Sequence, residues 1–316
     1  MIAAGTPAAP RGHPETPTMV QRLRQILVAT DLSREAGLAL ERAGRLAQEH
    51  GARLTLVHVA PATGRRAARS DRILRAVIPQ LHSVVAETAA KLGRAFQIRC
   101  ASVLARGEPA ALIARTARRF EAELIVLGAH GSASVLDQVI GTTADRVLRL
   151  SAAPVLVVRT HARVAYAEVL VPSDDSPAAH AAARFAARAF PTGRFLMLAV
   201  VNAPFEGFLM RYGADAQLLA AHRRSTAREA EARLRALAAQ AGIAERASLR
   251  VERGYVPAQI LRRAGELGDG VIAMGAYGRN PLAAKLLGGV SVRVAAGAPC
   301  DVLLVRPARR ARGATH

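Results

Sequence analysis

The sequence has few aromatic residues. Phe, Tyr and Trp make up only 3% of its 316 residues, and tryptophan is missing altogether. A hydrophobic core must therefore come from the aliphatic residues that bring the hydrophobic fraction to 51%. Such cores suit parallel sheets that helices cover on both faces. The scarcity of aromatic rings also removes the stacking platforms on which proteins hold single-stranded nucleic acid.

Cysteines and long apolar runs are also scarce. Cys100 and Cys300 are the only cysteines and have no CxxC spacing. This pattern implies neither a metal motif nor a disulfide framework, and it fits a reducing compartment. No apolar run approaches the roughly 18 residues of a membrane span. Residues 1–18 contain four prolines and no apolar segment of a secretory signal. We therefore expect a soluble cytoplasmic protein with no metal site and no membrane partner.

The chain is strongly basic, with a formal net charge of +20. Arginine supplies all 44 basic residues except Lys91 and Lys285. Such a field attracts anions, including nucleotides and nucleic acid. The arginines are scattered through helical patterns, however, and only residues 306–312 form a basic cluster. This distribution favours solvated helix surfaces over a nucleic-acid-binding face.

Short apolar segments alternate with amphipathic helical patterns, which predicts an α/β fold with a largely parallel sheet and right-handed crossovers. In the first half we expect strands at 24–30, 53–60, 97–104, 124–127 and 154–158. We expect helices at 34–50, at 71–96 with an irregularity near Pro79, from Pro109 to about 120, and at 142–150. His58 lies inside the second strand, which indicates a structural histidine rather than a catalyst.

The same pattern then starts again, as duplicated domains require. Residues 169–176 repeat residues 26–33, and the segment that ends at Gly278 repeats the one that ends at Gly131. In the second repeat we expect helices at 177–190 and 214–241, and a strand at 195–201. The sequence thus predicts domains at 21–160 and 165–307, a disordered tail at 1–20 and a basic tail at 308–316.

A glycine motif organises the first repeat. Gly128 and Gly131 follow the fourth predicted strand, and Gly141, Thr142 and Thr143 open the next helix. Glycines let the main chain approach a bulky anion, and the start of a helix favours negative charge. The threonine hydroxyls can donate to phosphate oxygens. The pattern is neither a P-loop nor a dinucleotide fingerprint.

The spacing G-x2-G-x9-G-[ST] resembles the nucleotide signature of the universal stress protein family, in its ATP-binding branch, and the resemblance covers both repeats. It implies two tandem Rossmann-like domains of the adenine nucleotide α-hydrolase type, each with a five-stranded sheet in the order 3-2-1-4-5. It also implies that strands 154–158 and 301–305 pair within the chain as a pseudo-dimer. A homodimer of whole chains is left open.

The resemblance further implies a site for ATP, with or without magnesium, or for AMP or a related adenine nucleotide. Asp31 would bond the adenine or ribose side, and the main chain at Val59 would meet the adenine edge. The remaining implied contacts come from Ala29, Thr30, Gly128, His130, Gly131, Gly141, Thr142 and Thr143. A helix-capping or turn role for Asp31 and a position in an exposed loop for His130 are the alternatives.

The second repeat has part of this set. Asp174, Gly275, Gly278 and Gly288 stand at the matching positions, but residue 289 is glycine where the first repeat has Thr142. The missing hydroxyl removes charge-assisted hydrogen bonds worth about 1.5–3 kcal/mol each. We therefore expect a weaker second site. Whether Ser291, two residues later, replaces the hydroxyl is left open.

No catalytic motif is present: the sequence lacks G-x-S-x-G, HExxH and paired acid spacing. Asp137 and Asp145, near the glycine motif, are expected in a loop and in a first helical turn. The sequence therefore predicts a regulatory nucleotide-binding module with at most slow ATP hydrolysis. Two alternatives are an ATP-using enzyme of the α-hydrolase type and a basic protein associated with nucleic acid.

Overall fold

The computed structural model of the chain describes residues 22–61, 68–129, 141–201, 211–213, 215–278 and 288–307. Both predicted tails lie outside these ranges. So does the segment 130–140, which contains His130, Gly131 and Asp137 of the sequence predictions.

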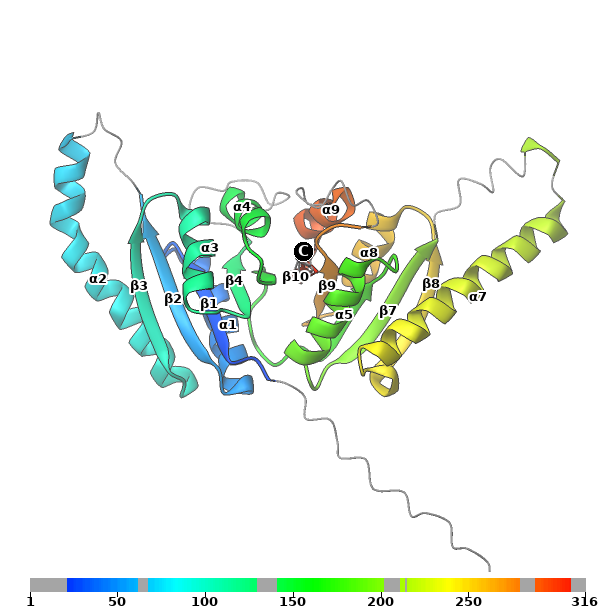
Figure 1. Cartoon of the computed structure of the whole chain (residues 1–316), viewed down its shortest axis with the longest axis horizontal. Coiled ribbons are helices and arrows are strands. Elements are labelled where there is room, and N and C mark those ends of the chain that lie inside the picture. The colour runs from blue at the N-terminus through cyan, green and yellow to red at the C-terminus, as the bar shows by residue number, and fades with distance from the viewer. Residues whose placement is uncertain are drawn as a thin grey trace, which may run out of the picture.

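Helices and strands alternate along both repeats (Figure 1). The first repeat consists of β1 (Gln25–Thr30), α1 (Ala36–His50), β2 (Arg53–Ala60), α2 (Ala68–Phe96), β3 (Cys100–Arg106), α3 (Pro109–Arg119), β4 (Leu124–Gly128), α4 (Thr142–Leu150) and β5 (Val155–Val158). The second consists of β6 (Glu168–Pro172), α5 (Pro177–Ala189), β7 (Arg194–Val201), α7 (Ala216–Gln240), the 3-10 turn η1 (Ala244–Arg246), β8 (Ala247–Arg253), α8 (Val256–Ala264), β9 (Val271–Gly275), α9 (Gly289–Gly297) and β10 (Asp301–Val305).

Local sequence signals set most of these boundaries. Gly51 ends α1 in the left-handed conformation, with φ 64°, which glycine adopts without strain. The third strand begins at Cys100, three residues later than predicted, because Gln97 lies in a turn with φ 53°. The irregularity predicted near Pro79 does not interrupt α2, which continues through this proline.

The ten strands form one sheet in the order β3-β2-β1-β4-β5-β10-β9-β6-β7-β8. Each repeat therefore has the predicted order 3-2-1-4-5, and the second half of the sheet reads as the first in reverse. All pairs within each repeat are parallel, whereas β5 and β10 pair antiparallel, with Val157 opposite Val302. This pairing confirms the predicted pseudo-dimer within one chain.

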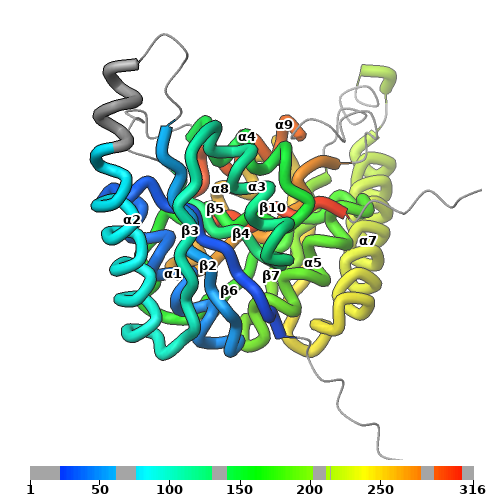
Figure 2. Tube along the Cα trace, turned by 60° about the vertical axis from the view of Figure 1, so that its left-hand side comes forward, coloured from blue at the N-terminus to red at the C-terminus, as the bar shows by residue number. Residues whose placement is uncertain are grey.

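Helices cover both faces of the sheet. One core joins the strands to α1, α2, α5 and α7, and the other joins them to α3, α4, α8 and α9. Successive residues of β1 alternate between them, since Ile26 and Val28 belong to the first core and Leu27 to the second. In two views α4 and α9 lie near each other at the top of the molecule, and Figure 1 shows them near the middle of its long axis (Figure 1, Figure 2). The starts of the two glycine-motif helices therefore belong to the same region.

A buried polar cluster ties the repeats together at β10. Asp301 is fully buried, and its Oδ1 accepts hydrogen bonds from the main-chain N–H groups of Arg159 and Thr160 at 2.8 and 3.0 Å. Its Oδ2 accepts from the Tyr166 hydroxyl and lies 3.4 Å from Nε of the buried Arg42 on α1. The Arg42 guanidinium also stacks 3.9 Å from the Tyr166 ring centroid. The contact between the repeats thus includes a desolvated ion pair as well as apolar packing.

A buried histidine provides a second contact between the repeats. His50, at the end of α1, is only 4% exposed. Its Nδ1 accepts the main-chain N–H of Leu23 at 3.3 Å, and its Nε2 lies 2.9 Å from the carbonyl oxygen of Ala189 on α5. Beside it, Glu123 forms an ion pair with Arg188 of the second repeat. Burial is the largest cause of a lowered pKa for His50, which keeps its ring neutral.

Candidate functional site

The predicted site residues meet at one edge of the sheet. β1 is paired with β2 on one side and with β4 on the other, all parallel. Asp31 follows β1, Val59 lies near the end of β2, and Gly128 ends β4. Because the carboxyl ends of parallel strands lie at the same edge, these residues share the edge of the sheet at which such folds form their ligand crevice. The prediction requires strands one and four to be neighbours, and the pairing of β1 with β4 confirms this.

A tight loop holds Asp31 in place. Thr30 Oγ1 accepts the N–H of Leu32 at 2.9 Å, and Asp31 Oδ1 accepts the N–H of Ser33 at 3.0 Å. Ser33 Oγ then accepts the N–H of Ala36, the first residue of α1, at 3.2 Å, although the N-cap position of this helix is Glu35. Leu32 adopts φ 64°, a conformation that non-glycine residues rarely take. Asp31 thus has both the turn role of the alternative interpretation and an exposed position at the crevice.

His58 packs against this loop from β2. Its Nδ1 lies 2.9 Å from the carbonyl oxygen of Thr30, and the side chain is half-buried. A ring nitrogen that is engaged with a main-chain carbonyl orients the loop. This contact fits the structural role predicted for His58.

The start of α4 lies at the same edge of the sheet. The Gly141 N–H donates to the Ala129 carbonyl at 2.9 Å, which places the helix start beside the end of β4. Gly141 provides no side-chain cap, and Thr142 and Thr143 are exposed in the first turn. The first N–H groups of a helix have no partner within it and carry partial positive charge. Together with two hydroxyls they form a donor set suited to an anion.

Acidic and basic side chains near α4 are engaged with each other. Asp145 accepts two hydrogen bonds from Arg149, each 3.0 Å long. Arg146 pairs with Glu108 at 3.0 Å. Asp145 is therefore a helix-surface residue, as predicted, rather than a base directed at a ligand.

The second repeat reproduces the aspartate loop closely. Asp174 Oδ1 accepts the N–H of Ser176 at 3.1 Å, and Ser176 Oγ caps α5 through the N–H of Ala179 at 3.2 Å. Asp175 takes the position of Leu32 and has nearly the same φ, 62°. The shared backbone geometry shows that the duplication extends to the details of this loop.

The two repeats differ at the start of the glycine-motif helix. Gly289 begins α9 and brings no hydroxyl, in contrast to Thr142. Ser291 does not replace it, because its side chain is 3% exposed and its hydroxyl donates inward to the Gly275 carbonyl at 2.9 Å. Ser291 therefore does not supply the hydroxyl that the second repeat lacks at residue 289.

Close contacts explain two glycines of the second motif. A Cβ on Gly275 would lie 2.7 Å from the Cβ of Ala178, so α5 requires glycine at the end of β9. A Cβ on Gly278 would lie 2.8 Å from Oδ2 of Asp174. Gly278 therefore lies directly beside the Asp174 carboxylate. The requirement at Gly275 comes from packing and does not depend on a ligand.

A cavity of about 380 Å³ opens beside the aspartate loop of the second repeat. Its lining consists of Ser173, Asp174, Asp175, Ala199, Val200, Val201, Ala230, Arg233 and Leu234. These residues come from the loop after β6, the end of β7 and one face of α7. The cavity is thus at the edge of the sheet where the carboxyl ends of β6 and β7 lie.

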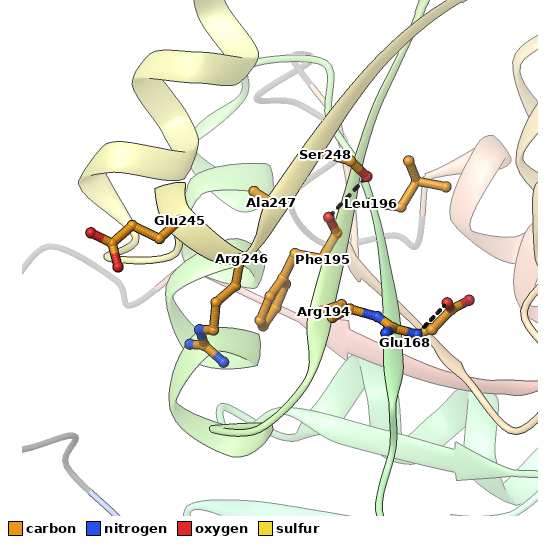
Figure 3. A pocket seen from close by; sticks show the side chains of 8 residues that line it. All are labelled: Glu168, Arg194, Phe195, Leu196, Glu245, Arg246, Ala247 and Ser248. Atoms are coloured by element: carbon orange, nitrogen blue, oxygen red, sulfur yellow. Dashed lines mark hydrogen bonds and ion pairs between the residues drawn. The ribbon is translucent and has the colours of Figure 1, made fainter.

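Another cavity, of about 480 Å³, lies at the opposite edge, where β7 and β8 begin (Figure 3). Its polar groups are largely engaged with the protein. Arg194 bonds Glu168 at 3.2 Å, and Ser248 Oγ donates to the Phe195 carbonyl at 3.4 Å. Arg246 bonds two main-chain carbonyls and stacks on the Phe195 ring. This cavity is remote from the predicted site residues.

The cluster around Asp301 escaped sequence analysis. A carboxylate at the start of an otherwise apolar strand was the signal that could have revealed it.

The sequence predicted no metal site. The described part of the chain contains no group of three or more histidine, cysteine or acidic residues suited to a metal ion. Cys100 and Cys300 are free thiols, and burial raises the pKa of the Cys300 thiol to about 12. Within the described ranges, no helix has the length and apolar character of a membrane span.

Comparisons with known proteins agree with this architecture. The chain is 29% identical over 150 residues to the universal stress protein YxiE of Bacillus subtilis, which corresponds to 43% of this chain and 98% of that protein. A universal stress protein of Archaeoglobus fulgidus superposes with a TM-score of 0.64 at 19% identity, covering 91% of this chain and 98% of the other. A functionally unknown protein of Pseudomonas aeruginosa gives 0.60 at 19%, covering 91% and 94%.

These two structures support the fold of the whole chain. The family profile described as the universal stress protein family matches residues 22–159 and matches again over residues 165–306. Both matches include an aspartate loop and a glycine motif. The chain therefore belongs to the universal stress protein family and carries two copies of its domain in tandem.

Proposed function

We propose that this protein is a regulatory module that binds ATP mainly in its first repeat. The proposed domains are residues 21–160 and 165–307. The observation that carries the proposal is the start of α4, where exposed Thr142 and Thr143 stand in the first turn, among the N–H groups that have no partner within the helix itself. This donor set lies at the same sheet edge as Asp31 and Val59.

Each end of the nucleotide would have its own set of partners. Asp31, Ala29 and Thr30 would border the adenosine, with the main chain of Val59 at the adenine edge. Gly128, together with His130 and Gly131, would lie along the ribose and the first phosphates. Gly141, Thr142 and Thr143 would donate to the outer phosphates. The outer phosphates would give the main-chain N–H groups and the two threonine hydroxyls several acceptor oxygens, and this match favours ATP over AMP.

The chemistry of the described residues supports binding rather than catalysis. Asp145, the acid closest in sequence to the helix start, is held by Arg149 and is not directed at the crevice. We therefore propose at most slow ATP hydrolysis, with nucleotide occupancy acting as the signal. Release of phosphate or pyrophosphate at a rate typical of enzymes would overturn this part of the proposal.

The test is a calorimetric titration of the nucleotide-free protein with Mg-ATP. Thr142→Ala combined with Thr143→Ala should weaken ATP binding about 10- to 100-fold, because charge-assisted hydrogen bonds are lost. The matched control, Gly289→Ala with Val290→Ala, changes the equivalent helix start of the second repeat and should leave this affinity unchanged. Unaltered binding in the threonine variant would contradict the assignment of the site.

A further inference from the structure

Two arginines stand where the repeats meet. Arg159 follows β5 of the first repeat, and Arg306 follows β10 of the second. Because β5 and β10 pair antiparallel, the end of each strand lies beside the start of the other. The start of β5 follows α4 along the chain, and the start of β10 follows α9. Each arginine is therefore brought to the end of the glycine-motif helix of the other repeat.

Arg306 binds the end of α4. Its Nη1 donates to the carbonyl oxygens of Arg149 and Leu148, at 2.8 and 3.5 Å. The last four carbonyls of a helix have no partner within it. Val147, the first of these four in α4, accepts the Ser151 N–H at 2.8 Å, and Arg306 binds the next two. A cation at this end also complements the partial negative charge of the helix.

Arg159 makes the matching contacts in the opposite direction. Its Nη2 donates to the carbonyl oxygens of Ala295 and Ala296 on α9, at 2.5 and 3.1 Å. These two residues lie 147 positions after Leu148 and Arg149, which is also the distance along the chain between the two arginines. The repeats thus exchange arginines, and a residue of each repeat completes the end of the glycine-motif helix of the other.

Arg306 also contacts the glycine motif of its own repeat. Its guanidinium lies 5.9 Å from the ring centroid of Tyr277, which stands between Gly275 and Gly278. Cation–π attraction acts at this distance from an aromatic ring. One side chain therefore joins the motif helix of the first repeat to the glycine motif of the second.

The order of the start of α4 depends on how firmly the whole helix is held. The helix has nine residues, and helices this short are marginal in water without tertiary contacts. Its start is held by the bond from the Gly141 N–H to the Ala129 carbonyl, and its end by Arg306. The two ends are only about 13 Å apart. Loss of the Arg306 contacts therefore loosens the turn that carries Thr142 and Thr143.

We propose that Arg306 is a positioning residue through which the second repeat orders the anion site of the first. This role rests on the proposed binding of ATP at the start of α4. Arg306 holds the last turn of that helix and so keeps the donors at Thr142 and Thr143 in place for the outer phosphates. The second repeat thereby raises the ATP affinity of the first whether or not it binds a ligand itself. Arg159 holds α9 in the same way.

Hydrogen–deuterium exchange of the full chain without nucleotide tests the reciprocal contacts. Arg306→Met removes the charge and the donors, and it should speed amide exchange in α4 at least about fivefold while α9 stays protected. Arg159→Met should speed exchange in α9 and not in α4. Faster exchange in the helix of the arginine's own repeat, or in neither helix, would overturn the reciprocal contacts.

Arg246→Met is the matched control for both variants. Arg246 also donates to two main-chain carbonyls and stacks on an aromatic ring, but it lies at the start of β8, the outermost strand of the second repeat (Figure 3). This variant should leave α4 and α9 as protected as in the wild type. Equal loosening of α4 in this control would show a general loss of stability and would overturn the specific role of Arg306.

Calorimetric titration with Mg-ATP tests the positioning role. Arg306→Met should weaken ATP binding about 3- to 10-fold, because the donors at the start of α4 lose order. Arg306→Lys returns a cation to the helix end and should recover part of the loss, and Arg246→Met should bind ATP as the wild type does. In the Thr142→Ala, Thr143→Ala background, Arg306→Met should weaken binding clearly less than it does alone. Unchanged affinity in Arg306→Met, or full additivity of the changes, would overturn the role.

The two proposals fail in different ways. If the wild type does not bind ATP, the proposed function is wrong and the positioning role falls with it, while the exchange measurement still shows whether the arginines hold the helices. If ATP binding depends on Thr142 and Thr143 but not on Arg306, the positioning role is wrong and the proposed function is unaffected.

Discussion

The two repeats share a backbone but differ in the chemistry that it presents. Their aspartate loops use the same hydrogen bonds, and the residue after each aspartate has a φ near 60°. The starts of the following motif helices differ, because α4 exposes two threonines and α9 begins with Gly289. The two repeats therefore share the geometry of the aspartate loop and differ in the side chains at the start of the motif helix.

The glycines of the second motif differ in what packing requires of them. A Cβ on Gly275 would lie 2.9 Å from the main chain of α5, so packing alone requires this glycine, whereas a Cβ on Gly278 would meet only the end of the Asp174 side chain. A glycine of the motif can thus be required by packing alone. Thr142 and Thr143 at the start of α4 are exposed. They are the positions at which the proposed function is best tested.

The largest expected effect concerns the buried cluster around Asp301, which connects the repeats. The two repeats differ here as well. Asp301 in β10 corresponds by the 147-residue repeat spacing to Pro154 before β5, so only one repeat supplies the buried carboxylate. Asp301→Asn leaves Arg42 buried without its counter-ion and should lower the free energy of unfolding by about 3–5 kcal/mol. Urea denaturation measures this.

The exposed Asp269→Asn is the control for this experiment and should change stability little. Adding Arg42→Met to Asp301→Asn removes the unpaired charge and should recover part of the loss. A loss below about 1 kcal/mol for Asp301→Asn alone would show that the ion pair does not hold the repeats together.

A hydroxyl added at residue 289 tests whether this group accounts for the expected difference in ATP affinity between the repeats. A Cβ on Gly289 meets no atom within 4 Å, so a larger side chain fits. In the Thr142→Ala, Thr143→Ala background, Gly289→Thr should raise ATP affinity at the second repeat about tenfold, through one charge-assisted hydrogen bond. Gly289→Val has the same shape without the hydroxyl, and calorimetry should find no gain for it. Equal gains in both variants would refute the role of the hydroxyl.

The smallest expected effect is the pH dependence of the contact between the repeats. Burial lowers the pKa of His50 below its ordinary value of 6.5. The unfolded chain therefore binds the proton more readily, and the stability that the neutral ring contributes is complete above pH 6.5 and is lost as pH falls through the lowered pKa. Thermal melts should show a steeper loss below pH 6.5 in the wild type than in His50→Gln.

The exposed His82→Gln is the control for these melts and should follow the wild-type curve. If the wild type and His50→Gln lost stability in parallel on acidification, His50 would not be the group that titrates. Because its Nδ1 accepts the Leu23 N–H, protonation has to break that bond.

Sequence reasoning succeeded where local signals decide the structure. The restart of the apolar pattern at residue 169 indicated the duplication, and the helix that begins at Thr142 and the strand Arg53–Ala60 have the predicted boundaries. Strand order came from the family resemblance, since periodicity alone does not tell which parallel strands are neighbours. The topology confirms that order in both repeats.

The features that sequence reasoning did not predict depend on contacts between distant parts of the chain. Arg42 and Asp301 are far apart in sequence, and no local pattern pairs them. The inward direction of Ser291 follows from the rotational phase of α9 against β9, which the residue type does not reveal. The roles predicted for His130 and Gly131 stay predictions, since both lie outside the described residues.

The most direct test of the asymmetry between the repeats is the number of ATP molecules bound per chain. Native mass spectrometry of the protein, stripped of nucleotide and titrated with Mg-ATP, should show one ATP bound per chain at concentrations that saturate the first repeat. Two ATP molecules of similar affinity would contradict the divergence of the second repeat. No bound ATP in folded protein would contradict the proposed function and leave the glycine motif with packing as its role.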